Sequence, residues 1–448
     1  MRQFSIIQKS QLEGNNRLDA DFYQPEYLSL LETLNKKQIT NLESLTTKIT
    51  QGPNPTFIDK GKSCLNGRNI KNNRVDIENS NYVSEKEYEK FNNFTVKEND
   101  ILITLKGLGS IGKTGLVFTD TNCIFSRDIG LIRLASQQWA RYVYAFLLSK
   151  YGEKQIQRAI SGGTGQLTLA TSYLKRLIIH SPSLVQVKFV SDIIKWSEEE
   201  YKKSNEFYLQ AEKLLLDELG LESFKPSEDL SFIVDYSELE KANRMDADYY
   251  QPKYEDLIEK LKAKKTMFLP EIIEDVPAKF IPKPDENYHY VELANINSSI
   301  GIIDGYSEVL GKEAPSRAKR ILRQGDVIVS SVEGSLGKVA LVDKTQEGFL
   351  ASTGFFQFRS KEILPEVLLI LAKSLIVKMQ LQKRCAGTIL MAVPSETLEN
   401  ILIPVVAKPV QQKIAELVRK SHEARKKSKE LLEEAKRKVE AMIEKAGD

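Results

Sequence analysis

Cysteine and histidine are scarce in this sequence of 448 residues, with three of each. Cys64, Cys123 and Cys385 lie in different regions, so they form neither a disulfide framework nor a metal-ligand spacing. No histidine has a second type of ligand close to it in the sequence. These absences exclude a disulfide-stapled fold, argue against a metal site and favour a reducing compartment.

Long apolar runs are also missing. The most apolar segment, residues 364–379, is interrupted by Pro365, Glu366, Lys373 and Lys378, so it predicts no membrane-spanning helix. The N-terminus lacks the apolar core of a secretory signal peptide. The formal net charge of +3 neither requires nor excludes binding to nucleic acid. We therefore expect a cytoplasmic protein of two or three domains.

The most informative feature is an internal repeat. Residues 17–27 return as residues 244–254, with the same Arg, Asp-Ala-Asp, Tyr-Gln-Pro and Tyr. Weaker matches follow in the same order: 99–104 with 325–330, 109–113 with 334–338, 163–164 with 387–388, and 174–179 with 398–403. The sequence thus predicts two copies of one domain, each followed by a long helix. We place the first domain at 1–185, its helix at 186–222, the second domain at 223–409 and the last helix at 410–448.

Both long segments avoid Pro and Gly over most of their length and carry apolar residues seven apart, which predicts that the helices pair. Residues 186–222 hold five lysines against nine acidic residues, whereas residues 410–448 hold eleven basic against eight acidic residues. Opposite charge favours pairing of the two segments with each other. The predicted contacts are Val187, Ile194, Tyr201, Tyr208 and Leu215 on one helix, and Ile414, Leu417, Ala424 and Leu431 on the other. Two separate solvated helices remain the alternative.

Within each copy the pattern is α+β. A short helix follows the Gln-Pro step, residues 100–105 and 115–118 are strands joined by a turn at 107–113, and residues 174–179 are a last strand. Residues 139–160, and 365–382 in the second copy, form an amphipathic helix. We expect two such domains on an antiparallel, pseudo-two-fold helix pair, at opposite ends of a rod of roughly 50 Å.

Residues 107–114 match the phosphate-binding loop pattern, but the segment that follows alternates like a strand and starts no helix. The second copy has Val332 and Val339 in place of the first Gly and the last Thr. What the copies share is a Gly-rich turn that presents Lys113 or Lys338. We predict that these lysines contact nucleic-acid phosphates. The alternatives are an ATP-using enzyme and a lysine that is only solvated.

Two further polar strips predict contacts with nucleic acid, because Arg pairs with guanine and Asn with adenine in two hydrogen bonds. Ordinary solvated loops remain the alternative for each strip. The candidates in the first copy are Arg68, Asn69, Lys71, Asn73, Arg74, Lys106, Arg158, Thr164 and Gln166. The candidates in the second copy are Lys279, Lys283, His289, Asn295, Asn297, Arg317, Lys319, Arg320, Lys383, Arg384 and Thr388.

Catalytic signals are weak throughout. Asp19 with Asp21, and Asp246 with Asp248, suggest paired carboxylates, but each pair lacks a third ligand type and follows a fixed Arg. We interpret the motif as a structural junction of Arg–carboxylate pairs and packed tyrosines. The sequence has no Asn-Pro-Pro-aromatic motif for amino methylation and no Ser/His/Asp set. We expect no catalytic residues and no enzymatic activity in this chain alone.

The matched stretches, residues 17–27, 69–88, 100–113, 163–179 and 409–414, resemble the specificity subunit of type I restriction–modification enzymes. The resemblance implies two target recognition domains, each of which reads one half of a bipartite DNA site. It implies helices that space the halves and dock two methyltransferase subunits, which bind S-adenosylmethionine. Restriction subunits would use ATP and Mg, so no cofactor belongs to this chain. Residues 181–186 depart from their counterpart, which leaves the start of the central helix open; a coiled-coil adaptor without DNA is a further alternative.

Overall fold

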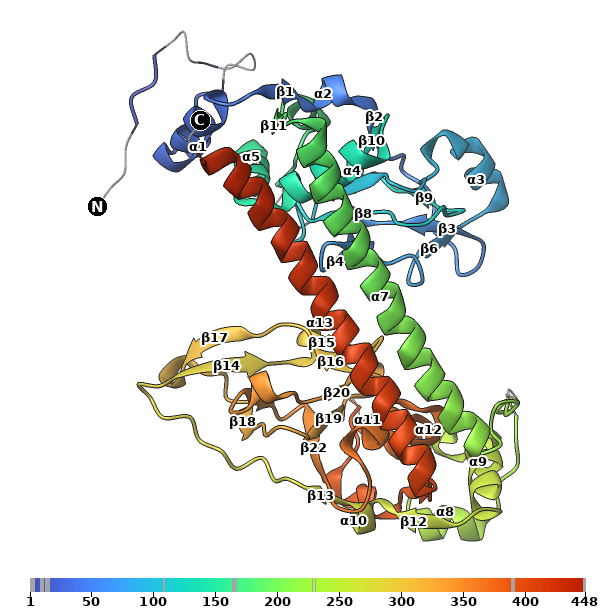
Figure 1. Ribbon diagram of the computed structural model, residues 1–448. Coiled ribbons are helices and arrows are strands. Elements are labelled where there is room, and N and C mark those ends of the chain that lie inside the picture. The colour runs from blue at the N-terminus through green and yellow to red at the C-terminus, as the bar shows by residue number, and fades with distance from the viewer. Residues whose placement is uncertain are drawn as a thin grey trace. The chain divides into compact units, whose positions relative to one another are not determined.

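The computed structural model describes residues 5–8, 12, 17–107, 109–162, 167–227, 229, 231–387 and 391–445. The chain divides into two compact units, Met1–Glu200 with Lys427–Asp448, and Tyr201–Lys426. Two long helices, α7 (Leu184–Glu218) and α13 (Lys408–Glu444), each contribute one half to each unit (Figure 1). Within the described part of the chain, no helix has both the length and the apolar character needed to cross a membrane.

The first unit is built on a six-stranded sheet in which every neighbouring pair is antiparallel except β5–β8. Its strands, in spatial order, are β2 (Thr46–Gln51), β10 (Ile129–Leu134), β7 (Ile101–Thr104), β8 (Thr114–Leu116), β5 (Arg74–Val75) and β4 (Ile70–Lys71). Smaller sheets join β6 (Asn81–Val83), β3 (Lys62–Leu65) and β9 (Ile124–Phe125), and pair β1 (Ile39–Asn41) with β11 (Ile178–His180). The helices are α1 (Pro25–Asn35), α2 (Leu42–Leu45), α3 (Glu85–Lys90), α4 (Gln137–Leu148), α5 (Lys150–Ala159) and α6 (Thr171–Lys175).

The second unit repeats this order strand for strand. Its six-stranded sheet runs β13 (Ile273–Asp275), β22 (Phe355–Ser360), β19 (Val327–Ser330), β20 (Val339–Leu341), β16 (Ile302–Ile303) and β15 (Ile296–Asn297). The smaller sheets are β17 (Ser307–Leu310), β14 (Asn287–Val291), β21 (Leu350–Ser352) and β18 (Ala318–Ile321), and β12 (Thr266–Phe268) with β23 (Leu402–Pro404). The helices are α8 (Tyr236–Ala242), α9 (Pro252–Lys262), α10 (Leu269–Ile272), α11 (Pro365–Lys373) and α12 (Leu375–Arg384). The predicted α+β fold with a duplicated domain is confirmed, and β18 has no counterpart among the strands described for the first unit.

One buried ion pair recurs in the core of both units. Asp100 at the start of β7 is almost fully buried and accepts from Arg133 Nε and Nη2, both at 2.7 Å. Asp326 in the second unit takes the same place, with Arg359 Nε at 2.9 Å. Each carboxylate also accepts a backbone N–H from three residues earlier, which closes the turn into the strand. The repeat in the sequence is therefore a repeat in core chemistry as well.

Two predicted elements differ from the structure. The helix predicted at 139–160 is two helices, because Ser149 is extended (ψ 163°) and its hydroxyl donates to Phe146 O at 2.6 Å. Ser374 breaks the second copy in the same way. The strand predicted at 174–179 begins as helix α6, and only β11 is strand. Apolar spacing continues through each of these changes, so the spacing alone does not reveal them. The helices predicted after the two Gln-Pro steps are confirmed as α1 and α9.

The long helices pair through buried positions that alternate three and four residues apart. On α7 these positions include Val187, Ile194, Tyr208 and Leu215, and a second row of Val190, Ser197, Ser204 and Ala211. On α13 the row of Ile414, Ser421, Ser428 and Ala435 is buried. The other row predicted on α13 is confirmed only in part. Ala424 is buried, but Leu417 and Leu431 are only half-buried, and Val418, Arg425 and Leu432, each one residue later, are buried.

Arg425 explains this difference. Because it is charged, the apolar pattern of the sequence does not identify its position as buried. Its guanidinium lies 3.8 Å from the centre of the half-buried Tyr201 ring, and Nη2 donates to Asn205 Oδ1. A cation over an aromatic face, with a hydrogen bond, tolerates burial. The helix pair thus buries an arginine that its charge pattern assigns to solvent.

Serines allow the two helix backbones to approach closely. In the first unit Ser197 and Ser428 each donate a hydroxyl to the other's carbonyl, both at 2.7 Å. In the second unit Ser421 donates to Ser204 O at 2.7 Å. An earlier residue of α7 lies opposite a later residue of α13, which makes the pair antiparallel, as predicted.

Candidate nucleic-acid interface

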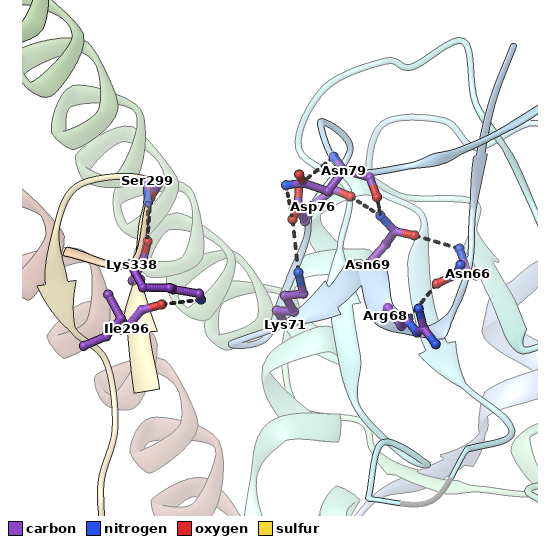
Figure 2. A network of polar contacts seen from close by, with 10 residues as sticks. Asn66, Arg68, Asn69, Lys71, Asp76, Asn79, Ile296, Ser299 and Lys338 are labelled. Carbon is purple, nitrogen blue, oxygen red and sulfur yellow. Dashed lines mark hydrogen bonds and ion pairs between the residues drawn. The ribbon is translucent and has the colours of Figure 1, made fainter. Parts of the chain in front are cut away.

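The polar loop after β3 is held together by Asn69. This side chain is 2% exposed; its Oδ1 accepts Asn66 N at 2.8 Å, and its amide donates to Asp76 O at 2.8 Å and Asn79 O at 3.0 Å (Figure 2). Both amide hydrogens are therefore used inside the loop. The predicted pairing of Asn69 with an adenine is not supported. In the second unit, Asn295 Oδ1 accepts Glu292 N at 2.9 Å, which is the same local role.

The neighbouring Asn73 belongs to a tight turn. Asn72 and Asn73 have φ of 50° and 61°, and they connect β4 to β5, where Lys71 pairs with Arg74. Asparagine tolerates this left-handed region better than most residues. The turn therefore explains why asparagine stands at both positions. The Tyr144 hydroxyl also donates to Asn73 O. The turn accounts for Asn73 without any contact with a base. Base reading by Asn73 therefore stays a prediction.

Arg74 does not extend into solvent but faces the helices. It forms an ion pair with Glu198 on α7 and donates to Ser428 Oγ on α13 at 3.0 Å. Its guanidinium also lies 5.3 Å from the centre of the Phe118 ring. The predicted DNA contact of Arg74 is therefore corrected: this arginine anchors the sheet of the first unit to its half of the helix pair.

Of the cations predicted to contact DNA in the first unit, Arg68, Lys71 and Lys113 are exposed to solvent. The backbone of Arg68 is fixed by its N–H to Asn66 Oδ1 at 2.8 Å, and Lys71 Nζ lies 3.5 Å from Asp76 Oδ2 (Figure 2). Lys113 ends the turn between β7 and β8, and Lys106 beside it is half-buried. Since β8 begins at Thr114 and no helix follows, residues 107–114 lack the helix N-terminus of a phosphate-binding loop.

The corresponding lysine of the second unit is placed differently. Lys338 is half-buried, and its Nζ donates to Ile296 O at 2.8 Å (Figure 2). Asn297, in the same loop, donates to Asp304 Oδ2 at 3.2 Å and accepts from Ser299 Oγ at 2.6 Å. Both predicted contacts thus have partners inside the second unit.

The basic residues at and beside β18 in the second unit differ in their exposure to solvent. Arg317 and Lys319 are exposed, whereas Arg320 is buried, donates to Val276 O, and has its pKa lowered by burial. The predicted DNA contact of Arg320 is corrected on this ground, because successive residues of β18 point to opposite faces. Lys279 and Lys283 are also exposed, the latter 2.7 Å from Glu286.

His289 belongs to an aromatic group on the rim of the second unit. Its ring stacks on Tyr306 with centroids 4.1 Å apart, and Phe349 meets it edge-on at 4.7 Å. Tyr306 is exposed. The three residues lie far apart in the sequence, which is why only His289 was a candidate.

The cations of the third predicted strip contact other residues of their own unit. Arg158 is buried, donates to Phe22 O at 2.8 Å and lies 3.8 Å from the centre of that ring. Lys383 lies 5.0 Å from the Tyr249 ring, and Arg384 donates to Gln380 O and Asn400 O. The predicted DNA contact of the buried Arg158 is corrected to a contact within the first unit. Lys383 and Arg384 are half-buried and have partners within the second unit. Thr164, Gln166 and Thr388 lie outside the described residues.

The repeated motif at 17–27 and 244–254 now has a structural role. Arg17 pairs with Asp19 and lies 4.4 Å from the Phe22 ring, so Arg17 and Arg158 both contact that ring. Arg244 pairs with Asp246, lies 4.5 Å from the Tyr249 ring and donates to Cys385 O at 2.9 Å. Each arginine holds the pKa of its carboxyl below the usual range. We call this arrangement the motif clamp; it confirms the junction interpretation.

Two kinds of reactive site, a metal cluster and a reactive thiol, are absent from the described residues. No group of three or more His, Cys, Asp or Glu side chains there is arranged to hold a metal ion. The three cysteines are buried, and burial raises the pKa of Cys64 to about 12 and that of Cys385 to about 11. Such thiols are protonated and poorly nucleophilic at neutral pH.

Comparison with protein families decides the identity of the repeated unit. The family model of the type I restriction modification DNA specificity domain matches residues 24–209 and again residues 262–436. The chain belongs to this family. A type I specificity chain recognises DNA within a restriction–modification system, and chains of this family are generally not catalysts.

Solved structures of type I specificity subunits are similar over most of their length. The S subunit of the type I system from M. genitalium is 14% identical over 91% of this chain and 94% of its own, with a TM-score of 0.41. The HsdS subunit from Thermoanaerobacter tengcongensis is 12% identical over 91% and 96%, with a TM-score of 0.29. The search of curated proteins finds no match.

Proposed function

We propose that each unit of this type I specificity chain reads one half of a bipartite DNA site. The observation that carries the proposal is one scaffold with two different surfaces. Both units have the same order of six strands. Among the predicted contact residues, however, the exposed cations are Arg68, Lys71 and Lys113 in the first unit, and Lys279, Lys283, Arg317 and Lys319 in the second. Because direct readout depends on which side chains reach the base edges, different surfaces select different half-sites.

The exposed cations serve two purposes in this proposal. The side chain of Arg68 extends from a backbone that is fixed by a hydrogen bond, and it can form two hydrogen bonds to guanine O6 and N7. Lysines such as Lys113 neutralise phosphates, which orients the protein on DNA without sequence preference. Arg74, Arg158 and Arg320, whose guanidinium groups bind partners within their own unit, take no part in contact with DNA.

The remaining subunits of the system supply the chemistry. Two methyltransferase subunits bind S-adenosylmethionine and methylate adenine, and separate restriction subunits use ATP and Mg. The helices α7 and α13, which both units share, set the number of base pairs between the half-sites. This chain supplies recognition and no cofactor.

Mapping of methylated adenines tests the proposal. The chain is expressed with the methyltransferase subunit of its system in a host that lacks other adenine methylation, and the modified sites are sequenced. We expect one motif made of two unlike half-sites with a fixed unspecified spacer. Methylation of a single continuous motif, or no sequence preference in complexes that do methylate, would contradict it.

Two simple binding assays address the alternatives. A coiled-coil adaptor would show no affinity for duplex DNA even at low salt, where phosphate contacts are strongest. An ATP-using enzyme would bind labelled ATP in the absence of other subunits. We expect DNA binding and no ATP binding.

A further inference from the structure

The repeated motif exposes side chains that its clamp does not use. Leu18 is 78% exposed, and Met245, 227 residues later, is 87% exposed. A single exposed apolar residue is ordinary. Here, however, the same position of the repeat is large, apolar and exposed in both units.

Two more exposed residues accompany each apolar side chain. Ala20 and Asp21 in the first unit are repeated as Ala247 and Asp248 in the second. Each of these aspartates accepts a hydrogen bond from a glutamine three residues later, at 3.4 Å from Gln24 and at 2.9 Å from Gln251. We call Leu18, Ala20 and Asp21, and their counterparts Met245, Ala247 and Asp248, the repeat patch.

The motif clamp gives the patch a rigid base. Arg17 and Asp19 alternate with the patch residues, and the pair is joined by two hydrogen bonds. Phe22 and Tyr23 beneath are buried. The patch is therefore held in one conformation before any partner arrives, which reduces the entropy lost on binding.

An exposed position outside the repeated motif has diverged between the units. The turns closed by Asn69 and Asn295 are equivalent, and they place Arg68 in the first unit where Ala294 stands in the second. Divergence is expected where two units read different half-sites. An exposed patch that stays the same instead fits a partner that is the same for both units.

A second pair of exposed residues follows the same rule. Ile6 is 85% exposed and Ile233 is 100% exposed, again 227 residues apart. The segments around them alternate between half-buried and exposed in step. Apolar exposure is thus repeated twice along the same stretch of each copy.

We propose that the repeat patch docks one methyltransferase subunit on each unit. The proposal rests on the proposed function, since it names the surface that receives those partners. The partner surface should offer an apolar pocket for Leu18 or Met245 beside a basic side chain for Asp21 or Asp248. The same partner surface fits both units because the patch has the same chemistry in both.

Substitution of the two apolar residues tests the proposal on the full chain. Leu18→Glu, Met245→Glu and the double variant are each titrated with the purified methyltransferase subunit, and the complexes are weighed by native mass spectrometry. We expect two bound subunits for the original chain, one for each single variant and none for the double variant at the same concentrations. Loss of the apolar area that Leu18 or Met245 would bury against the partner corresponds to about ten- to hundredfold weaker binding per site.

A charge variant and a matched control accompany the apolar variants. Asp21→Lys with Asp248→Lys should weaken the same binding by opposing a basic partner residue. Ile281→Glu alters a side chain that is 82% exposed outside the repeated motif, and should leave the stoichiometry unchanged.

The outcomes separate the two proposals. A double variant that binds two subunits with unchanged affinity overturns the docking proposal and leaves DNA reading intact. If the original chain binds neither DNA nor the methyltransferase subunit, the proposed function fails and the docking proposal fails with it. Unchanged DNA affinity of the double variant, measured without other subunits, shows that its fold is preserved.

Discussion

Neighbouring residues of the loop after β3 have opposite roles. Arg68 points to solvent on a fixed backbone, whereas Asn69 is buried and bonded on both edges of its amide. Arg68→Ala should therefore relax one position of one half-site by about 1–3 kcal/mol, while protein stability stays unchanged. Methylome mapping measures the first effect and thermal unfolding the second.

Asn69→Ala is the contrasting variant. It removes the hydrogen bonds to Asn66 N, Asp76 O and Asn79 O, so it should destabilise the first unit by about 1–3 kcal/mol. A change of motif in both half-sites after Arg68→Ala, or in neither, would show that this loop does not read bases.

Lys113 offers a test of phosphate contact at the same scale. Each neutralised phosphate contributes about −0.9 to the slope of log affinity against log salt, so Lys113→Ala should flatten that slope by about one for every DNA sequence. Titrations over a range of salt concentrations measure it. Lys338→Ala is the control: its Nζ already donates to Ile296 O, and we expect a smaller change in slope. Altered base preference in the Lys113 variant would contradict a phosphate contact.

His180 links the stability of the first unit to pH. It is buried on β11, its Nδ1 lies 2.9 Å from the Tyr142 hydroxyl, and burial lowers its pKa from 6.5 to about 4. Since the folded state binds the proton less well than the unfolded state, this stability is present above pH 6.5 and lost as pH falls towards 4. The loss by pH 4 should be about 3 kcal/mol. Denaturant unfolding of His180→Gln should show a shallower pH dependence; an equally steep one would remove His180 as the cause.

At the scale of the elements, small serines set how closely α7 approaches α13. Ser421 is fully buried and donates to Ser204 O at 2.7 Å. Ser421→Leu should push the helices apart and destabilise the second unit by about 1–3 kcal/mol. Ser421→Ala, which removes only the hydrogen bond, should cost about 1 kcal/mol. Equal stability of the two variants in denaturant unfolding would mean that close approach is not required.

The same scale shows where apolar spacing is informative and where it is not. The three-four alternation along α7 and α13 predicts a helix pair because it extends over many turns. The breaks at Ser149 and Ser374 are invisible to it, since one extended residue leaves the apolar positions on either side in place.

For the whole molecule, the proposed role of the helices predicts a change in spacer length. Four residues inserted after Glu200 in α7 and after Lys426 in α13 add about 6 Å, or roughly two base pairs of ~3.4 Å. A four-residue step preserves the alternation of the seam as a local stutter. The variant should methylate the same half-sites with one or two more spacer bases in methylome mapping. Eleven residues add about five base pairs and about half a turn of DNA, so that variant should lose activity. Full activity of the four-residue variant at the original spacing would refute the role of the helices as a ruler.

The sequence by itself determined the duplication, the α+β class, the antiparallel helix pair and the family, because these depend on patterns repeated over many residues. Only the tertiary structure decided which polar residues are buried. Asn69, Arg158 and Arg320 look like exposed contacts in the sequence, yet each reaches a carbonyl on a segment distant along the chain or across its own loop. A long polar side chain in a loop can turn towards solvent or towards the core, and local sequence does not distinguish the two. The choice is made by the partner that folding brings beside it.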